Sequence, residues 1–196
     1  MKKYNLFIIT VGVVLLIISV VPQFLSTYYI GLLTLILIFA LFAMSLDLLV
    51  GYTGLPSLGH AAFFGIGSYF AGIMSVKIAD NFGITLASGL VAAAICAAIF
   101  GLVVLRAKTH YFLIITLAIG QTLWAIAFKW RALTGGSDGF SGISRPNLGI
   151  IPWDLSSAIN YYYFVLIFFV IATALLYFIV NSPFGHILQG IRGSAR

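Results

Sequence analysis

Long apolar stretches alternate with short polar ones along most of the chain. A membrane-spanning helix needs roughly 20 mainly apolar residues to cross a hydrocarbon core of about 30 Å. We predict such a helix in each of six stretches: Leu6–Val21, Ile30–Val50, Leu58–Val76, Ile84–Leu105, Tyr111–Lys129 and Tyr161–Val180. The pattern therefore predicts an all-α, polytopic membrane protein. Alternatively, the third stretch enters and leaves the membrane on one side, which moves every later loop to the opposite face.

The third predicted helix lies in a stretch rich in helix-breaking residues, GYTGLPSLGHAAFFGIGSYFAG from Gly51 to Gly72. We interpret GYTGLPS as an irregular turn, which is tolerated at membrane depth only where protein or water covers its backbone. Ser57 is placed to cap the helix that follows. Small residues let membrane helices approach closely, and they repeat at helical spacing here and in the next predicted helix: Ala61, Gly65, Ser68 and Gly72, then Gly89, Ala93, Ala97 and Gly101. Both helices are therefore predicted to pack inside the bundle.

A connection of about 30 residues, from Arg131 to Asn160, separates the last two predicted spans. It is rich in glycine, serine and proline, which are the residues of turns. Loops of this length are usually functional or disordered.

The segment after the last span, NSPFGHILQGIR, has the pattern of a short amphipathic helix. Ser182 is placed as its N-cap and Pro183 at its first helical position. Apolar residues then recur with the period of one helix face: Phe184, Ile187, Leu188 and Ile191. We divide the chain accordingly into a transmembrane helical domain, residues 1–180, and an amphipathic segment, residues 181–196. The apolar face of this segment rests either on lipid or in a groove of a cytoplasmic partner.

Composition supports the membrane assignment, since 62% of the residues are hydrophobic and 7% are charged, against about 25% charged in soluble domains. The net charge is +6, but the basic residues form no cluster, so nucleic acid is not an expected partner. They lie in short groups between the spans, as expected for residues that orient helices in a bilayer. A cytoplasmic amino terminus puts six of them inside and four outside: Lys2, Lys3, Arg106, Lys108, Arg192 and Arg196, against Lys77, Lys129, Arg131 and Arg145.

Three polar side chains in or beside the spans are candidates for a pathway through the membrane or for its gate. Asp47 ends the second span, where a carboxylate either serves the pathway or hydrogen-bonds the glycine-rich turn. His60 either lines a pathway or bonds a neighbouring backbone carbonyl. Gln121 is predicted inside the fifth span, where its amide needs partners and either bridges helices or faces a pore.

Motifs of common enzymes are missing from the sequence. There is no H-E-x-x-H or C-x-x-C, and Cys96 is the only cysteine, so we predict no metal site and no disulfide. There is no G-x-S-x-G and no pair of intramembrane carboxylates. The G-x-x-x-x-G-K-[ST] loop is also missing, so the chain itself is expected to bind no cofactor, and any ATP binds to another subunit.

Three blocks together resemble a known family: LDLLVGYTGLPSLGHAAFFGIGSYFAG, YFLIITLAIGQTLWAIAFKWRALTGGSDGFSGI and SPFGHILQGIR. They are similar, in this order, to LivM-type permeases, which are inner-membrane subunits of ATP-binding-cassette importers of branched-chain amino acids. The resemblance covers about Ile30 to Arg192. Urea-importer permeases share part of the first block, but the LTGGSDGFSGI loop resembles the amino-acid branch. Family members continue with further spans, so the resemblance implies a truncated chain or a fragment.

The resemblance implies a permease that is not itself an enzyme and that works in an assembly. Its implied partners are a second permease subunit, cytoplasmic ATPase subunits, and a periplasmic or surface substrate-binding protein that delivers a small amino acid. The carboxyl-terminal segment matches the start of the family's ATPase-contacting region, and this implies contacts by Pro183, Phe184, Gly185, Ile187, Leu188, Ile191 and Arg192. Alternatives are a permease for urea or another small amide, a secondary transporter, and an intramembrane enzyme built on Asp47, His60 or His110.

Overall fold

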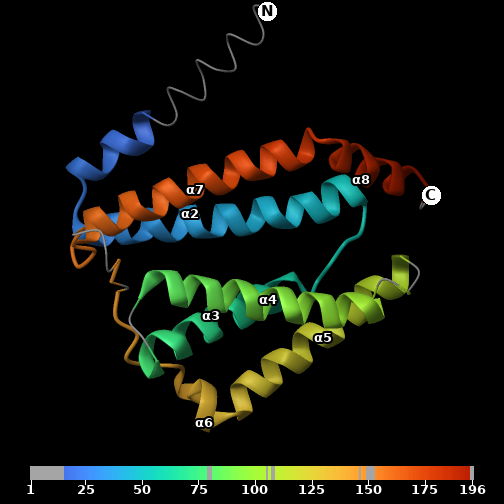
Figure 1. The fold of residues 1–196 in the computed structure, drawn as a ribbon, viewed down its shortest axis with the longest axis horizontal. Coiled ribbons are helices and arrows are strands. Elements are labelled where there is room, and N and C mark those ends of the chain that lie inside the picture. Colours follow the sequence, from blue (N-terminus) through green and yellow to red (C-terminus); the bar gives the residue numbers. More distant parts are fainter. Residues whose placement is uncertain are drawn as a thin grey trace, which may run out of the picture. The chain divides into compact units, whose positions relative to one another are not determined.

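The computed structural model describes residues 16–78, 81–104, 106, 109–145, 147–148 and 153–194. Over these ranges the chain folds into helices and connecting loops, with one isolated β-bridge between Asn81 and Asn147 (Figure 1). The helices in chain order are η1 (Val21–Phe24), α2 (Thr27–Asp47), η2 (Leu48–Tyr52), α3 (His60–Lys77), α4 (Phe82–Val104), α5 (Thr109–Lys129), α6 (Arg131–Thr134), η3 (Gly136–Asp138), α7 (Ala158–Val180) and α8 (Pro183–Ser194).

The structure confirms the all-α, polytopic class but not the number of six spans. Four helices in the described residues are long and apolar enough to cross a membrane: Thr27–Tyr52, Phe82–Val104, Tyr111–Lys129 and Ala158–Val180. Most of the first predicted span, Leu6–Val21, lies outside the described residues. The third predicted span is helical as α3, but its glycines, His60 and Lys77 make it less apolar than the other four.

The chain divides into two compact units. The first contains the chain up to Leu41 together with Asp154–Ala174, so it is built from most of α2 and most of α7. Its core is an apolar cluster of Ile30, Leu37, Tyr162 and Leu166. Tyr162 is only 1% exposed, and its hydroxyl donates to the carbonyl of Ile18 at 2.8 Å.

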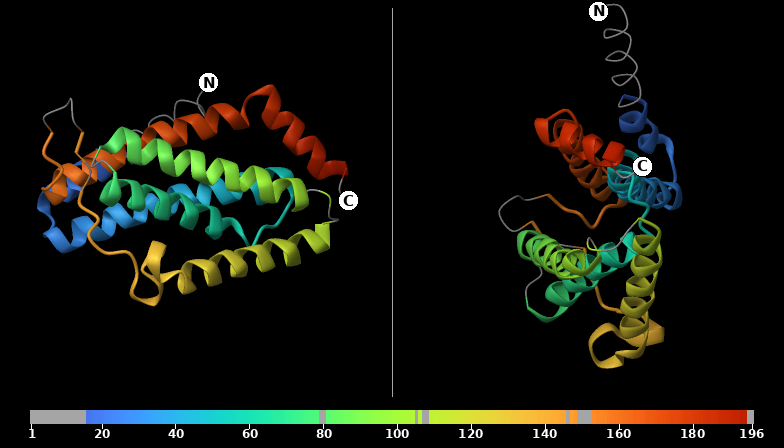
Figure 2. Two further views of the ribbon diagram at one scale, coloured as in Figure 1. Left: turned by 60° about the horizontal axis from the view of Figure 1, so that its bottom comes forward. Right: turned by 90° about the vertical axis from the view of Figure 1, so that its right-hand side faces the viewer.

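The second unit, Phe42–Trp153 with Leu175–Arg196, contains α3, α4 and α5. These three helices lie side by side (Figure 2). α3 and α4 approach closely at two glycines, since a Cβ on Gly89 would lie 2.8 Å from the carbonyl oxygen of Gly67. Ala71 and Ala93 flank this crossing. The two helices that carry the small-residue stripes therefore pack against each other.

The long predicted loop begins with two short helical turns, α6 and η3, beyond the end of α5. Thr134 fixes them to α5, since its hydroxyl lies 2.5 Å from the carbonyl oxygen of Ala127 and 2.8 Å from that of Trp130. Gly135 follows with φ +79°, and a Cβ there would overlap the carbonyl of Gly139. Only glycine fits both the left-handed conformation and the lack of space.

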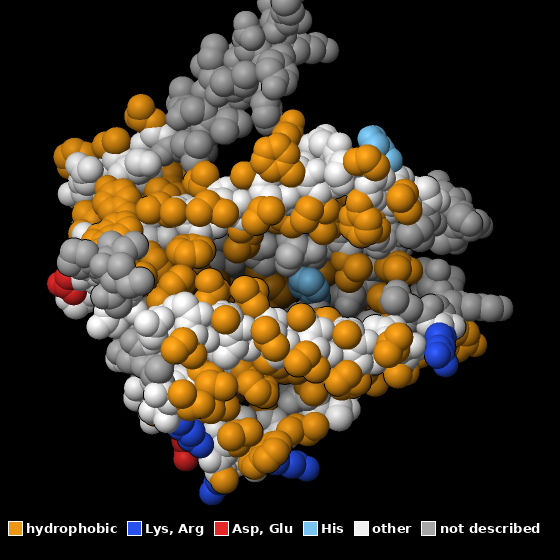
Figure 3. Space-filling view, viewed as in Figure 1, with side chains coloured by type: hydrophobic (Ala, Val, Ile, Leu, Met, Phe, Trp, Pro, Cys, Tyr) orange, Lys and Arg blue, Asp and Glu red, His pale blue; other side chains and the backbone are white. Residues whose placement is uncertain are grey.

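Large apolar side chains cover much of the surface of the described helices (Figure 3). Leu102, Phe178 and Phe184 are all more than half exposed. A water-soluble protein rarely exposes so continuous an apolar surface, whereas lipid or other membrane subunits can cover it. The surface therefore agrees with the membrane assignment.

Candidate functional site

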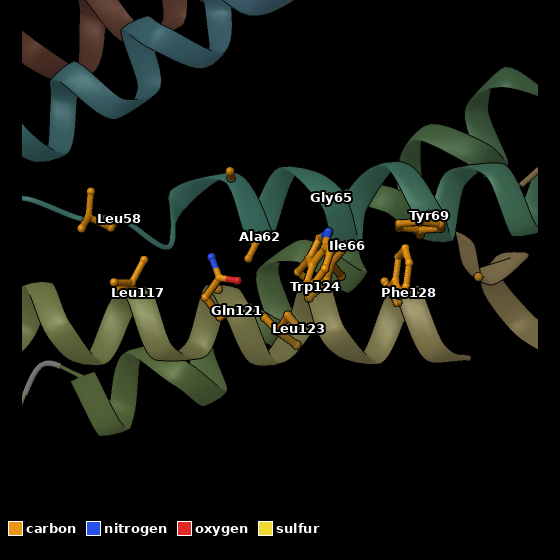
Figure 4. A pocket seen from close by; sticks show the side chains of 14 residues that line it. Leu58, Ala62, Gly65, Ile66, Tyr69, Leu117, Gln121, Leu123, Trp124 and Phe128 are labelled. Carbon is orange, nitrogen blue, oxygen red and sulfur yellow. The ribbon is translucent and has the colours of Figure 1, made fainter. Parts of the chain in front are cut away.

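A pocket of about 320 Å³ lies between α3 and α5, inside the second unit (Figure 4). From α3 and the residues before it, the wall includes Leu58, Ala61, Gly65 and Tyr69. From α5 it includes Leu117, Gln121, Trp124 and Phe128. The two sets follow spacings of three and four residues, so each forms one face of its helix.

Small residues on both helices leave room for the pocket, among them Ala61, Ala62 and Gly65 of α3 and Gly120 and Ala127 of α5. A Cβ on Gly65 would meet no atom within 4 Å. The Trp124 ring lies opposite Gly65 and Ile66, and the Phe128 ring lies opposite Tyr69 (Figure 4). Trp124 and Phe128 stack with their ring centroids 5.1 Å apart, which fixes both rings as a flat aromatic wall.

The pocket is chemically simple, with no charged side chain among its lining residues. Gln121, with its amide, and Tyr69, with its hydroxyl, are the polar residues in an otherwise apolar lining. Sites for small molecules usually combine an apolar lining with a few polar groups, in volumes of roughly 300 to 1,000 Å³. The arrangement suits a small ligand with an apolar side chain.

The turn before α3 forms one end of this region. The helix begun by α2 continues through Asp47 into the π-helix η2, and Gly54 then takes φ +73°. The Thr53 hydroxyl donates to the carbonyl of Leu49, closing the last helical turn. The prediction of an irregular turn is confirmed for residues 54–58, whereas Gly51 and Tyr52 are still helical.

The turn is fastened to α5 by Thr116. The N–H of Leu58 donates to Thr116 Oγ1 at 3.2 Å, and Thr116 Oγ1 itself donates to Leu113 O at 3.0 Å. A Cβ on Gly59 would overlap the backbone carbonyl of Thr116, so the two backbones are in direct contact. The predicted N-cap at Ser57 is wrong: Gly59 occupies that position and no side chain caps the helix.

His60 bonds a side chain rather than the backbone carbonyl considered above. Its Nε2 lies 2.8 Å from Ser45 Oγ, and Ser45 Oγ donates its proton to Phe42 O at 2.7 Å. The Ser45 hydroxyl therefore bonds both the imidazole of His60 and the backbone of its own helix. The Phe42 ring also lies beside the imidazole, with centroids 5.1 Å apart.

The structure separates the three candidate pathway residues. Gln121 lines the pocket, whereas Asp47 and His60 are not among its lining residues and belong to the two ends of the turn. Asp47 lies against Gly51, since a Cβ on Gly51 would be 2.6 Å from Asp47 Oδ1. The three residues therefore do not form one site, and their roles in transport stay predictions.

The small-residue stripe predicted on α3 has mixed surroundings. Ala61 and Gly65 face the pocket, and Gly72 faces Ile143 of the loop. The hydroxyl of Ser68 bonds carbonyls of its own helix. The close approach to α4 lies on another face, at Gly67 and Ala71, because the stripe and this pair differ by part of a helical turn.

α8 begins as predicted, with Pro183 as its first residue and Ser182 Oγ accepting from the N–H of Gly185 at 3.4 Å. Gly185 is buried, and a Cβ there would overlap the carbonyl of Val180. Pro183, Phe184 and Ile187 are exposed, and Leu188 is half-buried. The Ile191 side chain lies outside the described residues.

Arg192 has a partner that the sequence did not indicate. Its Nη1 donates to the carbonyl of Gly51 at 2.5 Å. Sequence reasoning also missed Tyr69, Trp124 and Phe128, although Trp124 and Phe128 follow Gln121 at helical spacing and Gln121 was already a candidate. This spacing along α5 was the feature of the sequence that could have identified Trp124 and Phe128.

Comparison with known proteins supplies the family. Residues 28–196 match the model of the branched-chain amino acid transport system/permease component family. The chain is 31% identical, over 74% of its length, to the high-affinity branched-chain amino acid transport system permease protein LivM of Escherichia coli (strain K12). It is 32% identical, over 68% of its length, to the protein of the same name in Salmonella typhimurium (strain LT2).

The matched regions cover 34% and 32% of these two relatives, so the chain spans about a third of their length. No solved structure matches the chain. The family model covers far more than half of the sequence, and the identities hold over two thirds of it or more. This chain therefore belongs to the family of permease components of branched-chain amino acid transport systems.

Proposed function

We propose that the chain is a permease subunit of an ATP-driven importer that carries leucine, isoleucine and valine across the inner membrane. The observation that carries this proposal is the pocket between α3 and α5, with its apolar wall and its Gln121 amide. Membership of the permease family and the four apolar helices support it.

The chemistry of the pocket favours an amino acid with an aliphatic side chain over urea. Each CH₂ group buried against Ile66, Leu117 or Trp124 contributes about 0.8 kcal/mol. Urea has no apolar part, and its polar groups cost free energy on leaving water unless each finds a partner. The charged ammonium and carboxylate of an amino acid would lie at the open side of the pocket.

The partners follow from the same proposal. With the amino terminus in the cytoplasm and all six predicted stretches crossing the membrane, α8 lies on the cytoplasmic side. There it presents Phe184 and Ile187, which are 57% and 61% exposed, to an ATPase subunit. That subunit binds and hydrolyses ATP. A second permease subunit completes the pathway, and a periplasmic or surface binding protein delivers the substrate.

Uptake of labelled substrates tests the proposal. Cells with the complete importer are compared with cells that lack this subunit, using leucine, isoleucine, valine and urea. We expect the subunit to be required for uptake of the three amino acids and not of urea, and ATP depletion to abolish that uptake. Unchanged amino-acid uptake without the subunit would contradict the substrate assignment, and uptake that survives ATP depletion would indicate a secondary transporter.

A variant in the pocket tests whether the pocket is on the route. Gly65→Leu adds a side chain where a Cβ has free space, so α3 can keep its fold while the pocket is filled. We expect leucine uptake to fall about tenfold or more. Gly31→Leu is the matched control, because Gly31 also has free space but lies in α2 outside the pocket. Equal uptake by both variants would remove the pocket from the pathway.

A further inference from the structure

Arg192 closes the end of the helix formed by α2 and η2. The last carbonyls of a helix have no donor within the helix, and they carry the negative end of its dipole. Gly51 lies in the last turn of η2, and its carbonyl accepts from Arg192 Nη1 at 2.5 Å. A charged donor makes a stronger hydrogen bond than a neutral one. The positive charge of Arg192 therefore lies at the negative end of this helix.

The aliphatic part of the same side chain packs on Gly54. A Cβ on Gly54 would lie 2.9 Å from Cγ of Arg192 and 3.6 Å from its Cβ and Cδ. Gly54 also has φ +73°, which glycine adopts without strain. Arg192 thus contacts the turn at both Gly51 and Gly54, on either side of Thr53.

The far end of the turn reaches the pocket. Leu58 lines the pocket, and its N–H donates to Thr116 of α5. Gly59 follows in direct contact with the Thr116 backbone, and His60 bonds Ser45 near the end of α2. Arg192 thus holds one end of residues 51–59 and Thr116 of α5 holds the other end, and only the four peptide bonds from Gly54 to Leu58 separate the two sets of contacts.

We infer that Arg192 is a positioning residue that couples α8 to the turn between α2 and α3. This inference rests on the proposed function. Phe184 and Ile187 contact the ATPase, whereas Arg192 contacts the segment between α2 and α3 instead. When the ATPase moves α8, Arg192 moves the end of η2 and Gly54 with it, and Leu58 and Gly59 pass the movement to the pocket.

The test uses the complete importer in liposomes, with its ATPase subunits and its binding protein. Arg192→Met keeps an apolar stem on Gly54 but loses the donor, and Arg192→Lys keeps a donor. Gln189→Ala is the control, an exposed position on the same helix. The measurements are retention of the ATPase subunits, the rate of ATP hydrolysis, and leucine imported per ATP.

We expect Arg192→Met to keep the ATPase subunits bound and hydrolysing ATP while leucine imported per ATP falls about tenfold, a usual size for coupling between sites. Arg192→Lys should recover part of this loss, and Gln189→Ala should match the wild type. Release of the ATPase subunits by Arg192→Met, or an unchanged ratio of import to hydrolysis, would overturn the inference.

Amide hydrogen exchange in residues 48–58 of the same complex provides a readout that does not depend on transport. Exchange should be faster in Arg192→Met than in the wild type, with Arg192→Lys between them. Unchanged exchange would overturn the coupling role even where the importer carries leucine. Wild-type liposomes that hydrolyse ATP but import no leucine would instead contradict the proposed function.

Discussion

The imidazole of His60 holds the start of α3 against the end of α2 through one hydrogen bond. Ser45 Oγ lies 2.8 Å from His60 Nε2 and 2.7 Å from Phe42 O, so this hydroxyl joins the imidazole to the backbone of α2. The bond is partly buried, and the two residues are 15 positions apart in the chain. It therefore fixes the geometry of the turn between them.

Ser45→Ala should destabilise the protein, because it leaves His60 Nε2 without its hydrogen-bond partner. A buried donor or acceptor that loses its partner costs about 1–3 kcal/mol. Thermal unfolding of the purified importer in detergent measures the change. Ser68→Ala is the control, since the Ser68 hydroxyl is exposed and bonds only carbonyls of its own helix. Equal shifts in both variants would mean that the Ser45–His60 bond adds nothing.

Of the secondary-structure elements, α4 requires glycine at position 89, where it crosses α3, but not at position 101. Gly89 and Gly101 both lie on α4 and belong to the same predicted stripe. A Cβ on Gly89 would lie 2.8 Å from the Gly67 backbone oxygen, whereas a Cβ on Gly101 would meet nothing within 4 Å. Backbone atoms cannot move aside as a flexible side chain can.

Gly89→Leu should therefore separate α3 from α4 and lower stability by several kcal/mol, since overpacking commonly costs about 1–3 kcal/mol even where side chains can adjust. Gly101→Leu should leave stability nearly unchanged. Thermal unfolding and expression level in the membrane measure both variants. A larger loss for Gly101→Leu than for Gly89→Leu would contradict the packing described here.

The elements themselves were largely predictable. Apolar stretches of about 20 residues are almost always helices in lipid, because the backbone must bond internally, and the predicted Ile84–Leu105 differs from α4 by two residues at the start and one at the end. The face of α3 that meets α4 was not predictable, because small residues occur on more than one of its faces. The sequence did not identify Trp124 and Phe128 as pocket residues, because aromatic residues on a span are equally typical of lipid-facing positions.

For the whole molecule, apolar exposure is the dominant property. The described helices bury few of their large side chains against each other and present many outward. Lipid gives helices no hydrophobic reason to associate, so close backbone contacts and a small number of hydrogen bonds hold the second unit together. Backbone contacts at glycines therefore determine the arrangement of the helices in the second unit more than a large apolar core does.

The contact of Gly59 with the Thr116 backbone has a consequence for genetic suppression. A Gly59→Ala importer should lose transport, since the added methyl group overlaps a carbonyl oxygen that every residue type at position 116 would also carry. Substitution of Thr116 therefore cannot restore it. In a selection for regained leucine uptake, we expect true reversion to glycine or changes elsewhere on α5 that displace the helix, and recovery of a revertant altered only at Thr116 would show that the two backbones are not in contact.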